Sequence, residues 1–142
     1  MSMVIVRDAL IDKLENVGLV EGRQGRTTGL PWTDGSILPL WTVTCIHSGL
    51  APGVVQPMGG NKCFERVFRL RGFFPHLFDA DSDTTWLQYL DTVMDLLSPQ
   101  PALDICTQTT PPVLMENDFI MYGEVLCHFA VFNFATQEWM VY

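Results

Sequence analysis

Two runs rich in β-branched and aromatic residues, Trp41–His47 and Cys63–Phe74, most constrain what this chain can fold into. Such runs favour extended strands over helices. The segment between them, Ser48–Lys62, contains four glycines and two prolines, and it is too long for a tight turn. We therefore expect an antiparallel strand pair joined by a long protruding hairpin.

Two segments have the apolar spacing of helices. In residues 4–17, Val6, Leu10 and Leu14 recur at helical intervals, and Gly18 would end that helix in a left-handed conformation. The clearest helix follows the acidic turn Asp79–Asp83, where Ser82 or Asp83 is the expected N-cap. Its apolar stripe consists of Trp86, Leu87, Leu90, Val93, Met94 and Leu97, and Pro99 and Pro101 would end it.

The rest of the chain indicates a long glycine-rich loop and further strands. Residues 18–38 read as the loop, and Ala102–Gln108 as a weak strand. After Pro111-Pro112, the segments Phe119–Tyr122 and Val125–Thr136 indicate a final strand pair or one strand bulged at Gly123. This order predicts a single α+β domain over residues 1–142, with a mainly antiparallel sheet of about four to five strands and two helices on one face.

Charge is divided unevenly along the chain. All eight Lys and Arg residues lie at or before residue 71 with six acids, which gives +2; residues 72–142 hold ten acids, which gives −10 and a net charge of −8. This acidity argues against a protein that wraps nucleic acid, because phosphate binding needs clustered cations. The asymmetry favours a subunit that assembles over an enzyme built around a charged pocket.

No combination of residues predicts a catalytic or metal site. Asp79, Asp81 and Asp83 have the spacing that opens a calcium loop, but Thr84 and Leu90 replace its required glycine and glutamate. The candidate zinc ligands are Cys45, His47, Cys63 and the Cys127-His128 pair. Cys45 and His47 would share one strand face, whereas the adjacent Cys127 and His128 would point to opposite faces. We expect neither enzymatic activity nor a cofactor.

The arginines of the second strand are more informative. Arg69 and Arg71 should project to one face of the sheet and Arg66 to the other, beside Phe64 and Phe68. Arginine among phenylalanines is typical of protein–protein contacts. The alternative is pairing with acids of the same subunit, such as Glu65 or Asp79–Asp83.

The sequence also bears on the compartment. No stretch is long and apolar enough to cross a membrane, and the first residues lack the features of a signal peptide. We expect synthesis in the cytosol, where the four cysteines would be buried free thiols.

The run Phe64–Phe73, the acidic turn Asp79–Asp83 and the helix Thr85–Leu97 together resemble the tail terminator proteins of long-tailed bacteriophages, also called tail-completion proteins. The flanking order of elements agrees over most of the chain, and residues 64–97 carry the motif-like part. The resemblance implies a structural virion protein, made in the host cytoplasm, that forms a ring, typically a hexamer, on the end of the tail tube. Such a ring stops tube polymerisation, meets the head-side connector and lets DNA pass without specific binding.

This resemblance suggests two sets of contact residues. In a ring, Arg66, Arg69 or Arg71 would meet acids of a neighbouring subunit, namely Asp79, Asp81, Asp83, Glu116 and Asp118. The hairpin would contact the tube or connector through Gly49, Pro52, Gly53, Pro57, Gly59, Gly60 and Asn61. Alternative functions are another neck or head-completion protein, a tail-tube protein, or a small metal- or ligand-binding domain.

Overall fold

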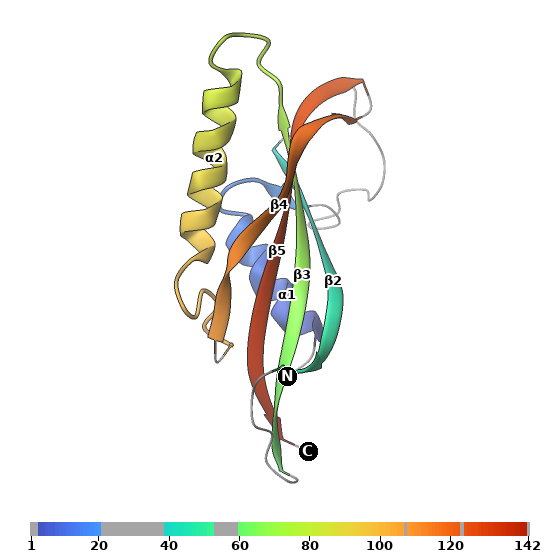
Figure 1. The fold of residues 1–142 in the computed structure, drawn as a ribbon, viewed down its shortest axis with the longest axis vertical. Helices are drawn as coiled ribbons and strands as arrows, with labels where there is room; N and C mark the ends of the chain where they lie inside the picture. The colour runs from blue at the N-terminus through green and yellow to red at the C-terminus, as the bar shows by residue number, and fades with distance from the viewer. Residues whose placement is uncertain (1–2, 21–38, 53–59, 107, 123, 142) are drawn as a thin grey trace.

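The computed structural model describes residues 3–20, 39–52, 60–106, 108–122 and 124–141. Its elements in chain order are α1 (Met3–Leu14), β1 (Leu19–Val20), β2 (Leu40–Leu50), β3 (Asn61–Pro75), α2 (Ser82–Leu97), β4 (Gln108–Tyr122) and β5 (Val125–Val141). Figure 1 shows a long twisted sheet with the helices beside it. The chain is therefore an α+β protein, as predicted.

The described strands form one sheet in the order β1-β2-β3-β5-β4. All neighbours are antiparallel except the two-residue β1, which runs parallel to β2. The central pair is β3 with β5, matched from Asn61 opposite Val141 to Pro75 opposite Cys127. The predicted pairing of the last two strands is confirmed, and β4 forms one edge of the sheet.

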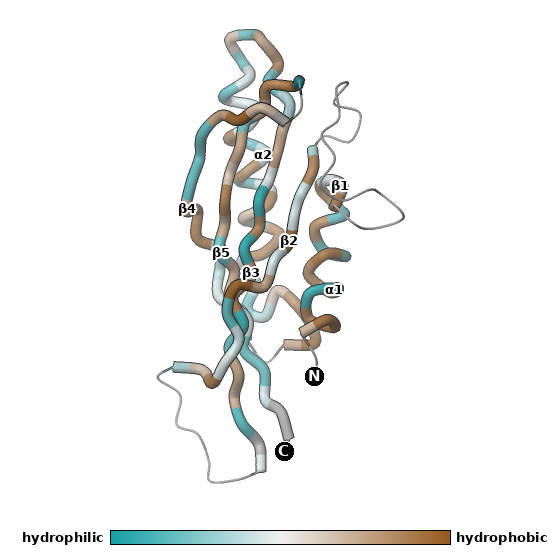
Figure 2. Tube along the Cα trace, turned by 90° about the vertical axis from the view of Figure 1, so that its right-hand side faces the viewer, coloured by the Kyte–Doolittle hydropathy of each residue, from teal (hydrophilic) through white to brown (hydrophobic). Residues whose placement is uncertain are grey.

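Both helices pack against the same face of this sheet (Figures 1 and 2), which we call the helix face. The buried cluster there joins side chains of α1 and α2 to alternate residues of the central strands, including Phe68, Phe132 and Phe134. Residues of opposite parity, such as Arg69 and Phe129, lie on the other side, which we call the open face. The predicted division of the strand residues between two faces is confirmed.

Trp41 holds the helix face together. A Cβ atom on Gly72 would lie 2.7 Å from the Trp41 ring, so the indole sits directly on the backbone of β3. Its Nε1 donates a hydrogen bond of 2.8 Å to the Tyr89 hydroxyl, which in turn donates to the Val17 carbonyl at 3.0 Å. Burial raises the pKa of Tyr89 to about 12, so the hydroxyl keeps its proton and remains a donor.

The helix boundaries differ from the predicted ones. α1 ends at Leu14, and the backbone of Gly18 is not left-handed, so the predicted glycine stop is wrong. Gly18 is instead needed for space, because a Cβ there would lie 3.0 Å from the Tyr89 hydroxyl. The predicted N-cap of α2, Ser82 or Asp83, is wrong: the N-cap is Asp81, and its side chain makes no capping hydrogen bond.

β4 is longer than the sequence indicates. The weak strand predicted over Ala102–Gln108 is wrong, since residues 102–106 form turns and β4 begins at Gln108. The strand then continues through Pro111-Pro112, where the pairing with β5 shifts in register. Proline is tolerated there because an edge strand need not donate on both sides. Pairing with β5 therefore outweighs the local break that the prolines suggested.

The structure describes the base of the β2–β3 hairpin. β2 extends to Leu50 and β3 begins at Asn61, so both strands run further into the predicted Ser48–Lys62 loop than expected. Gly53, Pro57 and Gly59 lie outside the described residues. Gly60 has a φ of 66°, a left-handed value that suits glycine.

Neither α1 nor α2 is long and apolar enough to span a bilayer. All four cysteines are free thiols, and Cys63, Cys106 and Cys127 are buried. Burial raises the pKa of Cys63 and of Cys106, which keeps both protonated and unreactive.

The contact between Trp41 and Gly72 predicts a sharp steric effect. Gly72→Ala should destabilise the fold by about 1–3 kcal/mol, because the new methyl group must displace a buried indole. Urea unfolding followed by circular dichroism measures this change. Gly49→Ala is the matched control, since its Cβ would meet nothing closer than 3.6 Å; equal effects of the two substitutions would contradict the packing described.

Candidate functional site

A groove on the open face contains the two arginines that the sequence singled out. It has a volume of about 280 Å³ and is lined by Arg69, Arg71, Met115, Glu116, Phe129, Val131 and Asn133. We call it the arginine groove. β3 supplies its cations, β5 supplies most of its apolar floor, and β4 closes one side. Arg69 and Arg71 therefore lie near Glu116 in the same chain. The predicted contact was with Glu116 of a neighbouring subunit.

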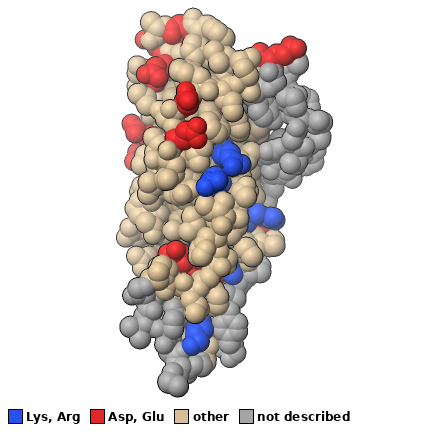
Figure 3. Space-filling model, turned by 45° about the vertical axis from the view of Figure 1, so that its right-hand side comes forward, with Lys and Arg blue, Asp and Glu red and all other residues tan. Residues whose placement is uncertain are grey.

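The groove has an excess of positive charge. Two guanidinium groups face one carboxylate, and among the described residues no ion pair links Glu116 with either arginine. Figure 3 shows Lys and Arg side chains from the middle of the molecule downwards, whereas most acids gather towards the upper end and one edge. On this face of the molecule, most of the positive and negative side chains therefore occupy different regions.

Arg66 does not belong to this surface. It lies on the helix face with 5% of its surface exposed and forms an ion pair with Glu138, which is 2% exposed. Its Nε also donates a hydrogen bond of 3.3 Å to Ser48 Oγ. The expectation that Arg66 meets a neighbouring subunit is therefore wrong, and its partner is an acid that the sequence had not suggested. Cross-strand neighbours explain the pair, since Glu138 is opposite Phe64 and Thr136 is opposite Arg66.

The acids predicted to lie at an interface are exposed. Asp79, Asp81 and Asp83 lie at the start of α2, where Asp79 Oδ1 accepts a hydrogen bond of 3.0 Å from the backbone N–H of Asp81. Asp118 is exposed on β4, opposite Phe129. Within one chain, no ion pair among the described residues joins any of these acids to Arg69 or Arg71.

The edge strand β4 has an unusual surface. Every residue from 113 to 121 is exposed. Six of them are large and apolar, and they point to both faces of the sheet: Val113, Leu114, Met115, Phe119, Ile120 and Met121. An edge strand also presents unpaired backbone donors and acceptors on its outer side. A surface of this kind is typical of a strand that another protein covers.

Phe78 is the most exposed large apolar residue of the described chain, with 76% of its surface accessible. Its φ of 56° is left-handed, which a bulky side chain rarely adopts. The backbone N–H of Phe78 donates to His76 Nδ1 at 2.8 Å, and the two rings lie 4.8 Å apart. The sequence had given no sign of this residue, because its backbone conformation depends on contacts made after folding.

Beneath Phe78, a buried histidine joins β5 to α2. The ring of His128 is stacked between Trp86, at 5.5 Å, and His76, at 5.0 Å. Its Nε2 lies 2.8 Å from Ser82 Oγ, which accepts the backbone N–H of Leu77 at 3.0 Å. Ser82 Oγ and His128 Nε2 thus share a hydrogen bond whose direction is set by the tautomer of the imidazole. Burial, reinforced by nearby His76 and partly opposed by Asp83, lowers the pKa of His128.

The pairing of Ser82 with His128 resembles a nucleophile and its base in distance alone. Ser82 is 1% exposed and His128 is 2% exposed, so no substrate reaches either atom. The hydroxyl is also held by the Leu77 amide at the start of a helix. We interpret the pair as a structural connection between α2 and β5, which sequence spacing could not have predicted.

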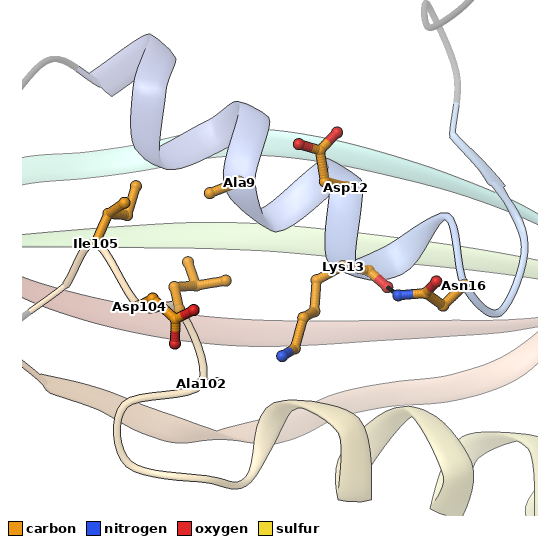
Figure 4. A pocket seen from close by; sticks show the side chains of 8 residues that line it. Ala9, Asp12, Lys13, Asn16, Ala102, Asp104 and Ile105 are labelled. Carbon is orange, nitrogen blue, oxygen red and sulfur yellow. Dashed lines mark hydrogen bonds between the residues drawn. The ribbon is translucent and has the colours of Figure 1, made fainter.

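A second groove lies between α1 and the segment that follows α2. It has a volume of about 310 Å³ and is lined by Ala9, Asp12, Lys13, Asn16, Ala102, Leu103, Asp104 and Ile105. Figure 4 shows Lys13 extending into the space between α1 and α2, and Asn16 turned back to the Lys13 carbonyl at 3.1 Å. Its few charged groups do not converge on one point, so we assign it no chemistry.

The residues considered for zinc do not converge. The pairing of β2 with β3 shifts between Cys45 and His47, which lie opposite Phe68 and Val67. These partners occupy opposite faces, so the prediction that Cys45 and His47 share a face is wrong. Among the described residues, no group of three or more His, Cys, Asp or Glu side chains is arranged to hold a metal ion.

The buried Arg66–Glu138 pair predicts an asymmetric pattern of stability. Glu138→Gln alone should cost about 3–5 kcal/mol, because it leaves a buried guanidinium without its counter-charge. The double variant Arg66→Met with Glu138→Leu should regain most of that loss, since neither charge then needs solvation. Urea unfolding of the three proteins measures the difference; a double variant less stable than the single one would refute the argument.

The lowered pKa of His128 predicts that acid weakens the fold. The unfolded chain takes up a proton near the ordinary value of 6.5, and the folded chain only at lower pH. Stability should therefore be complete above about pH 6.5 and fall as the pH drops towards the folded-state pKa. His128→Gln, which can still accept from Ser82, should flatten the dependence of the urea midpoint on pH between 7.5 and 5. The exposed His47→Gln is the control, and an unchanged slope in His128→Gln would exclude this explanation.

The described surface thus has three distinctive parts: a cationic groove on the open face, an exposed apolar edge strand, and an acidic upper end with an exposed phenylalanine. No arrangement of the described side chains suggests catalysis. A comparison with protein-family models and with curated proteins finds no match for this chain.

Proposed function

We propose that this chain is a structural virion protein that forms a ring on the end of a phage tail tube, ends tube polymerisation and joins the tail to the head-side connector. The observation that carries the proposal is the exposed edge strand β4. The resemblance of residues 64–97 to tail terminators gives the assembly its identity. The proposal includes no enzymatic role.

The apolar side chains on β4 are costly to leave in water, which favours self-assembly. Six large apolar side chains lie in nine consecutive exposed residues of this strand. Burying such a side chain contributes about 1.5–3 kcal/mol, so covering even half of them would supply a substantial part of a stable contact. Edge strands that stay monomeric usually carry lysines or are short. β4 has fifteen residues and no lysine or arginine.

The two ends of the sheet favour a ring over a symmetric dimer. One edge is the long exposed β4, and the other is β2 with the two-residue β1. Because these surfaces differ, a copy that binds through one of them leaves the other available for the next copy. Contacts of this heterologous kind give closed rings or open filaments. A hexamer is the ring size that the resemblance implies.

The charge distribution suits a passage for DNA. Residues 72–142 carry ten acids and no lysine or arginine, and phosphate binding would require clustered cations. An acidic wall repels the phosphate backbone and so allows DNA to slide. The base of the β2–β3 hairpin, with Gly49, Pro52, Gly60 and Asn61, is the part that we propose meets the tube or the connector.

Substitutions on β4 test the proposal. The purified wild-type chain should form single rings by electron microscopy, with a multiple of the 16.0 kDa subunit mass by light scattering. Val113→Lys with Ile120→Lys should remain folded and lose the ring, because two charges would enter the covered strand. Leu87→Lys, on the exposed side of α2, is the matched control and should retain the ring.

Each other outcome separates the alternatives. Stacked tubes of unlimited length would favour a tail-tube protein over a terminator. A wild-type chain that stays monomeric at all concentrations, alone and with tail tubes, would refute the proposal. Rings that survive both β4 substitutions would show that assembly uses another surface.

A further inference from the structure

Phe78 and its neighbours form an exposed turn at the upper end of the molecule. The left-handed backbone at Phe78 is unfavourable for a residue with a side chain, and it persists because surrounding contacts impose it. His76 supplies two of them, a hydrogen bond to the Phe78 amide and a ring contact at 4.8 Å. His76 is itself stacked on the buried His128. The strained phenylalanine is therefore held outward, into solvent.

Two carboxylates, Asp79 and Asp81, follow Phe78 closely in the sequence. Asp79 and Asp81 are both exposed and are joined by the 3.0 Å hydrogen bond between their side chain and backbone. We call Phe78, Asp79 and Asp81 the aromatic plug. An exposed aromatic ring beside negative charges has the composition of an interface anchor, because a partner could bury the ring and pair with the carboxylates.

The arginine groove has the complementary composition. Its floor is apolar, with Met115, Phe129 and Val131, and Arg69 and Arg71 lie beside that floor. Guanidinium groups stack on aromatic rings and bind carboxylates in a bidentate manner, so one groove can accept both parts of the plug. Glu116 also lines the groove, which leaves one positive charge in excess for the incoming acids.

One chain cannot fill its own groove. The plug is attached to His76, whose ring contacts His128 and Phe119 on the helix face. The groove opens on the other side of the sheet, among residues of opposite parity such as Arg69, Arg71 and Phe129. A contact between plug and groove therefore requires a second copy. Because each copy has one plug and one groove, the contact repeats around a ring.

We infer that the aromatic plug of one copy seats in the arginine groove of the next copy and forms a principal contact of the ring. This inference rests on the proposed self-assembly and names its partner surfaces. It also assigns Phe78 a reason for its strained conformation. The side of β4 that carries Met115 and Glu116 would be covered by the same contact.

Phe78→Gly should weaken assembly without lowering the stability of the fold. Glycine accepts the left-handed backbone, so the melting temperature of the variant should be unchanged or higher. Loss of the Phe78 side chain should raise the dissociation constant of the assembly at least tenfold. Analytical ultracentrifugation of the full chain measures this change. The control is Leu50→Gly, which removes another exposed apolar side chain at the lower end of β2 and should assemble normally.

A charge exchange tests the pairing itself. Arg69→Glu with Arg71→Glu should abolish the ring, as should Asp79→Arg with Asp81→Arg. The chain that carries all four substitutions should recover the ring, because the opposite charges again face each other. Recovery should weaken between 0.05 M and 0.5 M salt, as expected for partly exposed ion pairs.

The results distinguish this inference from the proposed function. A wild-type ring that persists in Phe78→Gly, or a four-substitution chain that fails to reassemble while remaining folded, would overturn the plug contact and leave the ring in place. A wild-type chain that never assembles would remove both. If each double charge variant loses the ring and the four-substitution chain recovers it, the contact between plug and groove is established.

Discussion

The packing of Trp41 on Gly72 is the contact on which the arrangement of this molecule depends. The indole fills the space over a strand residue without a side chain, and its N–H reaches the Tyr89 hydroxyl on α2. That hydroxyl then bonds to Val17, just beyond α1. A chain of two hydrogen bonds thus ties both helices to β2 and β3. Since the helices are held on one face, they leave the other face and the outer side of the edge strand uncovered.

This division explains why the charged residues have such different roles. Arg66 and Arg69 are three positions apart on one strand, yet one is buried against Glu138 and the other lies beside an open groove. Strand alternation decides which is which. Separating the buried pair would leave an uncompensated charge in the protein interior, so Arg66 is committed to Glu138 of its own chain. Arg69 and Arg71 make no ion pair among the described residues.

Much of the fold could be predicted from local pattern. The stripe from Trp86 to Leu97 and the two β-rich runs gave α2, β2 and β3, because their periodicity survives in the folded state. β4 could not be predicted as one strand, since Pro111-Pro112 signals a break and only pairing with β5 carries the strand past it. The bulge between Cys45 and His47 likewise comes from the register with β3 and reversed the expected facing of those residues.

The candidate site was predictable only in part, for the same reason. Alternation placed Arg69 and Arg71 on a common face, and the structure adds Phe129, Val131 and Met115 beside them from strands distant in sequence. Phe78 gave no local signal because its conformation is imposed by His76. The contact between Ser82 and His128 joins residues 46 positions apart. Such features depend on tertiary packing, which spacing along one chain does not record.

The unequal lengths of helix and strand have a further consequence. α2 has sixteen residues and is about 24 Å long, whereas the seventeen residues of β5 extend roughly 55 Å. The lower part of the β3–β5 ribbon therefore continues past the helix-covered core, as Figure 1 shows. Adding or removing residues there in pairs on both strands preserves which side chains face each side. The reach of this ribbon can thus change in steps of two residues while the packing around Trp41 stays the same.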